Sequence, residues 1–257
     1  MTLDRTLSFA QHTKNVKAKV AARNSLLGKL ANSNWGADPK TLRTTALALS
    51  YSSAEYCSAV WARSCHAKKV DPELNNACRV VTGQLRPTPL PLLYRSAGIA
   101  PPEVRRQVHS STHKFKQETD QRHPLFDHKY PESRLKSRKR FRTVESLDPD
   151  HSASRRLEIW NEWDNVSNEA VQQPSEHLPT GTSLPRKNWV SLNRARAKVG
   201  KTASTLHKWK LVPSSECPCG NPKQTVDHIL SECTEGPHCT DQDLRECTDT
   251  AQAWITH

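Results

Sequence analysis

The residues of this chain best suited to chemistry lie between positions 217 and 233. Three thiols and one imidazole fall within this short stretch: Cys217, Cys219, His228 and Cys233. Four nitrogen and sulfur ligands of this kind close a tetrahedron around Zn²⁺ in structural sites. The segment therefore predicts a structural zinc site in the C-terminal part of the chain.

The first ligand pair has an unusual spacing. Its pattern is Cys-x-Cys, whereas finger-type pairs leave two to four residues between the cysteines. Pro218 and Gly220 can supply the tight turn that this spacing needs. If Cys219 does not bind, Cys239 and His238 are the reserve ligands.

The second pair sets a limit on the local helix. His228 and Cys233 are five positions apart, which is about 140° around an ideal helix. A short helix that begins near Thr225 must therefore end or loosen before Cys233. The alternative interpretation is a set of ordinary thiols in a small helical tail, with a solvated imidazole.

Charge is unevenly distributed along the 257 residues, whose net charge is +12. Residues 1–119 carry 18 basic and 7 acidic groups, residues 120–186 carry 11 of each, and residues 187–257 carry 9 and 8. In the last region the basic groups come first, with seven between Lys187 and Lys210 and no acidic one. Two positive regions indicate contact with the phosphate backbone of RNA or DNA. A solvated basic helix surface is the alternative.

The sequence also favours an intracellular protein, nuclear or cytoplasmic, without a membrane partner. No run of eighteen apolar residues is present, and the start, from Met1, lacks the apolar core of a signal peptide. The eight cysteines are therefore not expected to form a disulfide framework. Cys57 and Cys78 lie on apolar helical patterns and are predicted to be small buried residues.

Apolar periodicity predicts a mainly α fold, with a compact helical unit over residues 1–119. A helix is expected over 8–31, another after Asp38-Pro39, and a third from Asp71 until Gly83 stops it. A short apolar helix over 92–97 and a basic helix over 102–117 complete the unit.

Residues 120–186 predict a low-order linker, because they hold few aliphatic residues and several prolines. Six Lys or Arg residues fall between Arg134 and Arg142. A block of this kind is most simply a solvated linker, with a phosphate-binding arm or a nuclear localisation signal as alternatives. The stretch from Leu157 to Trp163 is predicted to form one isolated helix.

Residues 187–257 predict a small helical C-terminal module. A basic helix is expected from Trp189 to Gly200, and a second, shorter helix over 204–211 carries Trp209. We interpret Trp209 as a buried anchor of this module, with stacking on a base as the alternative. The candidate zinc ligands follow directly and complete a CCHC-type, zinc-knuckle-like tail.

Two parts of the chain resemble one known family. The N-terminal segments that carry the likeness are 2–9, 23–30, 35–36, 42–46, 56–61 and 97–102, and the C-terminal ones are 192–196, 207–209, 217–220 and 228–233. The first set is similar to the region after the palm in non-LTR (LINE-type, jockey-like) retrotransposon reverse transcriptases. The second set resembles the cysteine–histidine tail of the same polyproteins. The likeness covers about 1–105 and 187–235.

This resemblance implies a helical thumb, which in the family cradles the template–primer duplex. The family's palm carries a Tyr/Phe-x-Asp-Asp turn that binds two catalytic metals, and no Asp-Asp pair occurs in this chain. Its endonuclease segment is likewise not matched. We therefore expect a nucleic-acid-binding fragment of an RNA-directed DNA polymerase that does not polymerise alone.

The expected contacts are basic residues that neutralise phosphates without reading sequence. They are Lys14, Lys17, Lys19, Arg23, Arg105, Arg106, Arg194, Arg196, Lys198 and Lys201. The alternative is a non-functional, poorly folded relic, or an interaction module that associates with an intact polymerase. An enzyme of another kind is disfavoured, because the acidic groups over 241–249 follow no catalytic motif.

Overall fold

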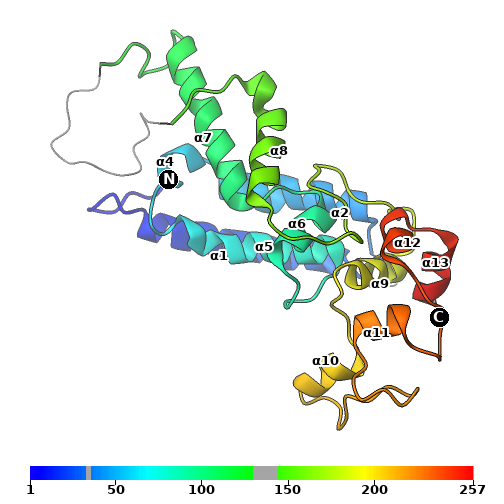
Figure 1. Ribbon diagram of the computed structural model, residues 1–257. Coiled ribbons are helices and arrows are strands. Elements are labelled where there is room, and N and C mark those ends of the chain that lie inside the picture. The colour runs from blue at the N-terminus through cyan, green and yellow to red at the C-terminus, as the bar shows by residue number, and fades with distance from the viewer. Residues whose placement is uncertain (33–35, 130–143, 257) are drawn as a thin grey trace.

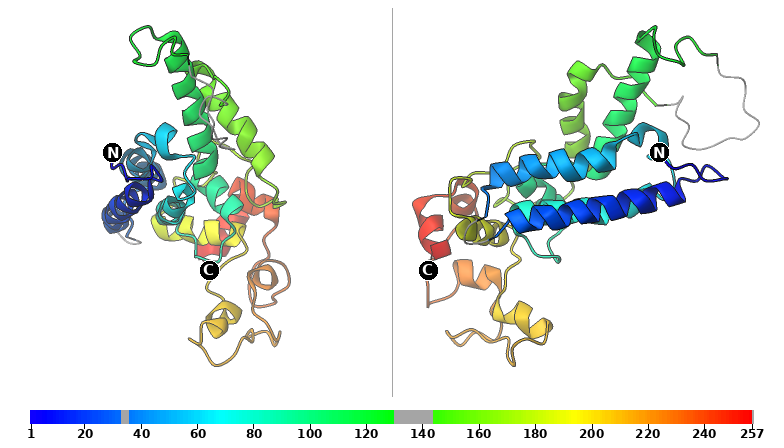
Figure 2. Two further views of the ribbon diagram at one scale, coloured as in Figure 1. Left: turned by 90° about the vertical axis from the view of Figure 1, so that its left-hand side faces the viewer. Right: turned by 180° about the vertical axis from the view of Figure 1, so that it is seen from behind.

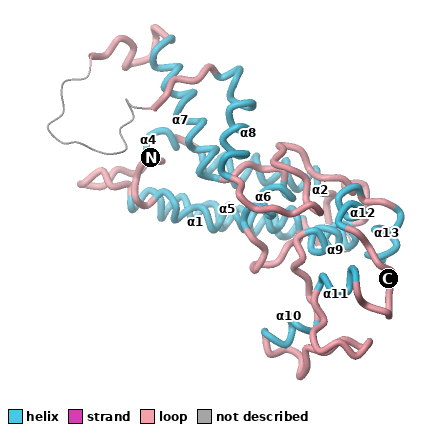
Figure 3. Tube along the Cα trace, in the orientation of Figure 1, coloured by secondary structure: helices cyan, strands magenta, loops and turns pink. Residues whose placement is uncertain are grey.

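The structure is a computed structural model that describes residues 1–32, 36–129 and 144–256. Every regular element in these ranges is a helix (Figures 1 and 3), so the predicted mainly α fold is confirmed. The basic block from Arg134 to Arg142 lies outside the described residues. Within them, no helix combines the length and the apolar character that a bilayer crossing needs.

A first group of helices is built around the long helix α1. The elements are α1 (Ala10–Leu30), α2 (Pro39–Thr45), the π-helix η1 (Ala46–Tyr51), α3 (Ser52–Glu55), α4 (Ser58–Trp61), the 3₁₀ helix η2 (Ala67–Val70), α5 (Asp71–Thr82), α6 (Leu90–Ala97) and α7 (Pro102–Thr119). Val16, Val20 and Leu27 on one face of α1 are buried in a core shared with α5 and α6. These contacts confirm the helix predicted over 8–31, whose last residue in α1, Leu30, is exposed.

Local signals set several helix boundaries as predicted. The Asp38 side chain accepts hydrogen bonds from the backbone N–H groups of Lys40 and Thr41, with Pro39 in the first turn. Gly83 ends α5 in the left-handed region at φ 72°. Its missing side chain is also needed for packing, since a Cβ there would lie 2.3 Å from Val190.

The second half of the predicted linker is folded. It contains the 3₁₀ helix η4 (Pro149–His151) and α8 (Ser152–Trp163), which runs beside α7 in Figures 1 and 2. Trp160 on α8 is fully buried in the main core. The prediction of an isolated helix is therefore wrong, because this single large side chain supplies much of the contact that aliphatic residues would otherwise make.

The segment after α8 is fixed by charge as well as by packing. Arg95 on α6 donates two hydrogen bonds to the Asp164 carboxylate, at 2.5 and 2.7 Å, and a third to the carbonyl of Val166. Ala170 and Val171 are buried nearby in the chain. The prediction of low order for 120–186 is thus wrong over 144–186, where ion pairing replaces the missing aliphatic residues.

The C-terminal helices form a second group around α9. They are α9 (Arg186–Arg196), α10 (Ala203–Lys208), α11 (Val226–Ser231), α12 (Asp241–Glu246) and α13 (Asp249–Thr256). Leu192 and Ala195 of α9, Leu230 of α11 and Leu244 of α12 share a small apolar core. This arrangement matches the predicted helical C-terminal module.

Helix α9 connects the two groups by capping the C-terminal end of α5. The last carbonyl groups of a helix have no partner inside it, and here side chains of α9 supply the donors. Arg186 donates to the carbonyls of Val80 and Val81, Trp189 to that of Val81, Asn193 to that of Thr82 and Arg194 to that of Gly83. Two of the donors are cations, which favour the negative end of a helix. The C-terminal helices are therefore joined to the N-terminal body.

Candidate metal centre

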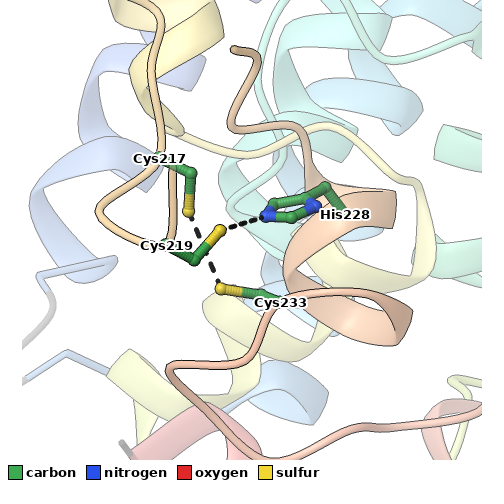
Figure 4. Close-up of side chains that lie close together, drawn as sticks. All are labelled: Cys217, Cys219, His228 and Cys233. Carbon is green, nitrogen blue, oxygen red and sulfur yellow. Dashed lines mark hydrogen bonds between the residues drawn. The ribbon is translucent and has the colours of Figure 1, made fainter. Parts of the chain in front are cut away.

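The four predicted ligands lie together (Figure 4). The candidate ligand atoms of Cys217, Cys219, His228 and Cys233 are all within 4.8 Å of one another. Cys217 and Cys233 are buried, and no cysteine of the chain is paired in a disulfide. In the described part of the chain, this is the one group of three or more Cys, His, Asp or Glu residues that could hold a metal ion.

The distances between the ligand atoms approach those of a tetrahedral site. With Zn–S bonds of about 2.3 Å and a Zn–N bond of about 2.05 Å, the edges of a tetrahedron are about 3.8 Å between sulfurs and about 3.6 Å between sulfur and nitrogen. The Cys217 and Cys233 sulfurs are 3.7 Å apart, and the Cys219 sulfur is 3.2 Å from Nε2 of His228. Only small side-chain adjustments therefore separate the cluster from a closed coordination shell.

A tight turn places the first two thiols. The Gly220 N–H donates to the Cys217 carbonyl at 2.9 Å, and the Cys217 N–H donates to the Asn221 carbonyl at 2.8 Å. Gly220 has φ 91°, a conformation that glycine adopts without strain. The turn predicted from the Cys-Pro-Cys-Gly sequence is thus confirmed, and it brings sulfurs two positions apart onto one centre.

Helix α11 positions the imidazole. Thr225 caps its start by accepting a hydrogen bond from the His228 N–H at 3.1 Å. Val226 and Leu230 face the apolar core, and His228, about 200° around the helix from Val226, faces the thiols. The helix ends before Cys233, whose N–H donates to the His228 carbonyl at 2.9 Å. The predicted end of the helix before this last ligand is confirmed.

Polar groups around the ligands orient them further. Nδ1 of His228 faces Oε2 of Glu232 at 3.4 Å, which leaves Nε2 directed at the thiols. A carboxylate behind a ligating imidazole is a common arrangement in metal sites. The Gln224 side-chain amide donates to the Cys217 sulfur at 3.7 Å.

The environment of Cys217 favours the thiolate. Burial raises the pKa of Cys217, but hydrogen bonds with the backbone and thiol of Cys219, and with Cys233 and His228, outweigh burial and lower the pKa to about 7. The thiolate is the form that binds metals. A metal-binding form of this residue is therefore accessible at neutral pH.

The reserve ligands lie outside the cluster. Cys239 is buried in the apolar core of the C-terminal helices, where burial raises the pKa of its thiol to about 11. The His238 imidazole contacts the carbonyl of Cys233 at 3.2 Å. The geometry therefore selects Cys219 as the fourth ligand.

A cavity of about 480 Å³ adjoins the cluster. Cys217, Cys233 and Trp254 of α13 are among the residues that line it. Arg194 and Lys201 also contribute to its wall. The cluster thus borders a largely apolar hollow whose wall carries two cations and one carboxylate, that of Glu235.

The predicted phosphate contacts separate into two groups. The exposed ones are lysines: Lys14, Lys17, Lys19 and Lys201. Three of these lie on α1 and one precedes α10, so the structure does not bring them together at one place. They are the members of the predicted set whose charges face solvent.

Three of the predicted arginines make contacts within the N-terminal helices. Arg105 forms a bidentate ion pair with Glu55, and Arg106 forms one with Asp71 at 2.5 and 3.0 Å. Arg23 donates to the Leu49 carbonyl at 2.7 Å. These internal contacts occupy their guanidinium groups, and their assignment as phosphate contacts stays a prediction.

The predicted basic residues of the C-terminal helices also make contacts within the protein. Arg196 is fully buried and donates to the carbonyls of Leu244, Thr180 and Arg245. Lys198 forms ion pairs with Asp241 and, at 3.5 Å, with Asp227. Arg194 is half-buried and donates from Nε to the Gly83 carbonyl at the end of α5.

The prediction for one aromatic residue, Trp209, was wrong. Trp209, expected to be a buried anchor, is 40% exposed at the end of α10. Lys208 and Lys210 beside it are exposed too. The absence of acidic residues from 187 to 215 is the sequence signal that could have indicated this surface.

Comparison with models of protein families, with curated proteins and with solved structures found no match. The class of the protein is therefore defined by its own fold and site. It is a helical protein whose C-terminal module carries a Cys₃His cluster able to hold a metal ion.

Proposed function

We propose that this chain is a zinc-stabilised nucleic-acid-binding protein. The observation that carries the proposal is the attachment of a basic segment to the Cys₃His cluster. Gln224, next to the ligands, accepts hydrogen bonds from the backbone N–H groups of Ala203, at 2.8 Å, and Ser204, at 3.3 Å. Its own N–H donates to Ser215 at 2.8 Å. A metal in the cluster would therefore order the basic segment.

Zinc is the metal that the ligand set favours. Three thiolates and one imidazole match a closed structural site with four protein ligands. Soft thiolate ligands also disfavour Mg²⁺ and Ca²⁺, which prefer oxygen. In this role the metal contributes folding free energy to a module with a small core of its own.

Phosphate binding is the role that the exposed charges favour. Four lysines around the cluster face solvent: Lys201, Lys208, Lys210 and Lys223. No acidic residue is present between 187 and 215, which holds the first three, whereas Lys223 lies between Glu216 and Asp227 in the sequence. Lysines in such a surface neutralise phosphates and release counterions, whatever the base sequence.

The same site supports the family expectation. A helical body joined to a Cys₃His tail is the arrangement that the resemblance to non-LTR reverse transcriptases implies. We therefore propose a fragment of such a polymerase that binds RNA or DNA. The proposed role is binding rather than polymerisation, because the family's paired aspartates do not occur in the sequence.

Metal removal tests the proposal with the full-length chain. Zinc-loaded protein should bind a labelled oligonucleotide at low salt, measured by fluorescence anisotropy. Chelation should weaken the affinity by about tenfold or more, since the free energy of structural zinc binding is folding free energy. Added Zn²⁺ should restore the affinity, and Mg²⁺ should not.

Two results would contradict the proposal. One is a zinc-loaded protein that binds neither RNA nor DNA at low salt. The other is an affinity that stays the same after chelation, which would separate the metal from the binding surface.

A further inference from the structure

The exposed end of α10 combines aromatic, aliphatic and cationic side chains. Trp209 is 40% exposed and Leu211 is 68% exposed, although large apolar side chains gain free energy from burial. Lys208 and Lys210 alternate with them along the chain, and both are exposed. The pattern is an indole that faces solvent with a cation on each side.

Backbone hydrogen bonds fix the position of this aromatic residue. The Trp209 N–H donates to the carbonyls of Thr205, at 3.2 Å, and Leu206, at 3.1 Å. The Leu211 N–H donates a hydrogen bond to the Leu206 carbonyl at 3.0 Å. Lys210, between Trp209 and Leu211, has the left-handed conformation at φ 60°. This turn closes the end of α10, so the indole is held on an ordered helix terminus rather than on a free loop.

The position of α10 in the molecule leaves this end accessible. Figures 1 and 2 show α10 at the extremity of the chain's C-terminal part, on the side away from α7 and α8. The contacts of α10 with Gln224 attach its start to the turn that carries the metal ligands. The end of α10 that carries Trp209, which we call the Trp209 platform, is therefore exposed and at the same time anchored to the cluster.

We propose that Trp209 stacks on an unpaired base of single-stranded nucleic acid, while Lys201, Lys208 and Lys210 contact the phosphates on either side. This inference rests on the proposed function and adds to it the strandedness of the ligand. In a duplex, each base face is covered by its neighbours, so an indole meets a free base face only where the bases are unstacked. Aromatic side chains in basic grooves bind single strands in this way.

Charge supports a nucleic-acid ligand over a protein with an apolar face. An apolar partner would have to cover several lysines without an acidic residue from this segment to balance them. A polyanion gains from each of these lysines. The observed mixture of one indole and flanking cations is therefore matched best by bases and phosphates together.

The test compares the full-length protein with Trp209→Ala and Trp209→Phe variants. The ligands are a single-stranded oligonucleotide of about 12 nucleotides, within the usual range of single-strand site sizes, a duplex of equal length and an abasic strand of equal length. Trp209→Ala should weaken single-strand binding by about 5- to 150-fold, the range reported for the loss of one stacked base. Trp209→Phe should keep most of the affinity, because a phenyl ring also stacks.

The abasic strand separates stacking from phosphate contact. It keeps the charges and removes the bases, so the wild type and Trp209→Ala should bind it equally. Zinc content and helix content by circular dichroism should be the same in all variants, because the indole is on the surface. A Trp209→Ala protein that binds the single strand as tightly as the wild type would overturn the inference.

Equal losses on the single strand, the duplex and the abasic strand would also overturn it, since such losses would come from the fold or the charge. Failure of the proposed function would look different. In that case the wild type itself would bind none of the three ligands.

Discussion

Three local backbone features position the four candidate ligands of the Cys₃His cluster. The Gly220 turn places Cys217 and Cys219, the capped start of α11 directs His228, and a hydrogen bond after the helix returns Cys233 to the cluster. Because these features are local, they bring the four side chains together within seventeen residues. The site then needs only ligand deprotonation and small side-chain movements to close.

Replacing Cys233 by Ser should remove the metal. A serine hydroxyl remains protonated and is a poor ligand, so the zinc affinity should fall by more than about 100-fold, the upper end of losses for outer contacts of a metal site. Elemental analysis of the full-length chain should give one zinc per wild-type molecule and almost none for Cys233→Ser.

Cys239→Ala is the matched control for this variant. Cys239 is a buried cysteine of the same module but contacts none of the ligands, and alanine fills its apolar site without a polar atom. This variant should keep its zinc. Unchanged zinc in Cys233→Ser, or zinc lost in Cys239→Ala, would show that the ligand set is wrong.

The grouping of the four Cys₃His side chains was predictable because it depends on residue type and short spacing. Cys217 and Cys233 are near enough in sequence for a turn and one short helix to bring them together. The burial of Arg196 and its hydrogen bonds were not predictable, because its partners lie 16 and 48 positions away in the sequence. Nothing in the residues next to Arg196 distinguishes a buried guanidinium from one that contacts phosphate.

At the scale of helices, local residues set where a helix begins and ends, whereas contacts between distant residues determine how the helices pack. Asp38, Pro39 and Gly83 mark helix ends through their own backbone preferences, and the sequence predicts them. The capping of α5 by α9 depends on pairs such as Asn193 and Thr82, which are 111 positions apart. Such pairs are set only when the whole chain is packed. The same reason explains why the order over 144–186 escaped prediction.

Arg196→Met tests whether this arginine joins elements or binds phosphate. Its guanidinium links α9 to the Thr180 segment and to the end of α12. Burial lowers the pKa of Arg196 to about 10, which still leaves it charged at neutral pH. Methionine would leave several buried carbonyls without donors, at a cost of about 1–3 kcal/mol each when unsatisfied.

We therefore expect the free energy of unfolding to fall by at least about 2 kcal/mol in Arg196→Met, from the loss of those hydrogen bonds. Urea denaturation followed by circular dichroism measures this. Arg245→Met, on the exposed surface of α12, should change it by less than about 0.5 kcal/mol. A stable Arg196→Met protein with weakened nucleic-acid binding would instead assign Arg196 to the interface.

Across the whole molecule, arginines and lysines have different roles. Arg95, Arg105, Arg106 and Arg196 pair with carboxylates or carbonyls inside the protein. A planar guanidinium with several donors suits such buried contacts, whereas the flexible, strongly hydrated ammonium of lysine suits the surface. The net charge of +12 is therefore a poor count of the charge available to a ligand. Among the residues that the structure describes, the accessible positive charge is mainly that of lysine.

Two sets of exposed lysines contain the predicted phosphate contacts whose charges face solvent. The tip lysines are Lys201, Lys208, Lys210 and Lys223, and the α1 lysines are Lys14, Lys17, Lys19 and Lys29. The two sets lie on separate parts of the molecule, one around α10 and one on α1 (Figure 1). A single strand on the Trp209 platform reaches the tip lysines first. The α1 lysines belong to the N-terminal helices, which under the proposed function would contact a duplex.

Replacing each set by glutamine should change the salt dependence of binding in different ways. Log affinity falls with log salt by about 0.7 for each phosphate contact on single strands and about 0.9 on duplex DNA. The tip variant should therefore lose up to about 3 from the slope measured on a single strand. The α1 variant should leave that slope unchanged and reduce the slope on a duplex.

Anisotropy titrations over a range of salt concentrations give both slopes, with the unfolding free energy of each variant as the control for folding. Equal slopes for the wild type and the tip variant on a single strand would mean that these lysines only solvate the module, and the Cys₃His cluster would then hold a structure without a phosphate-binding surface.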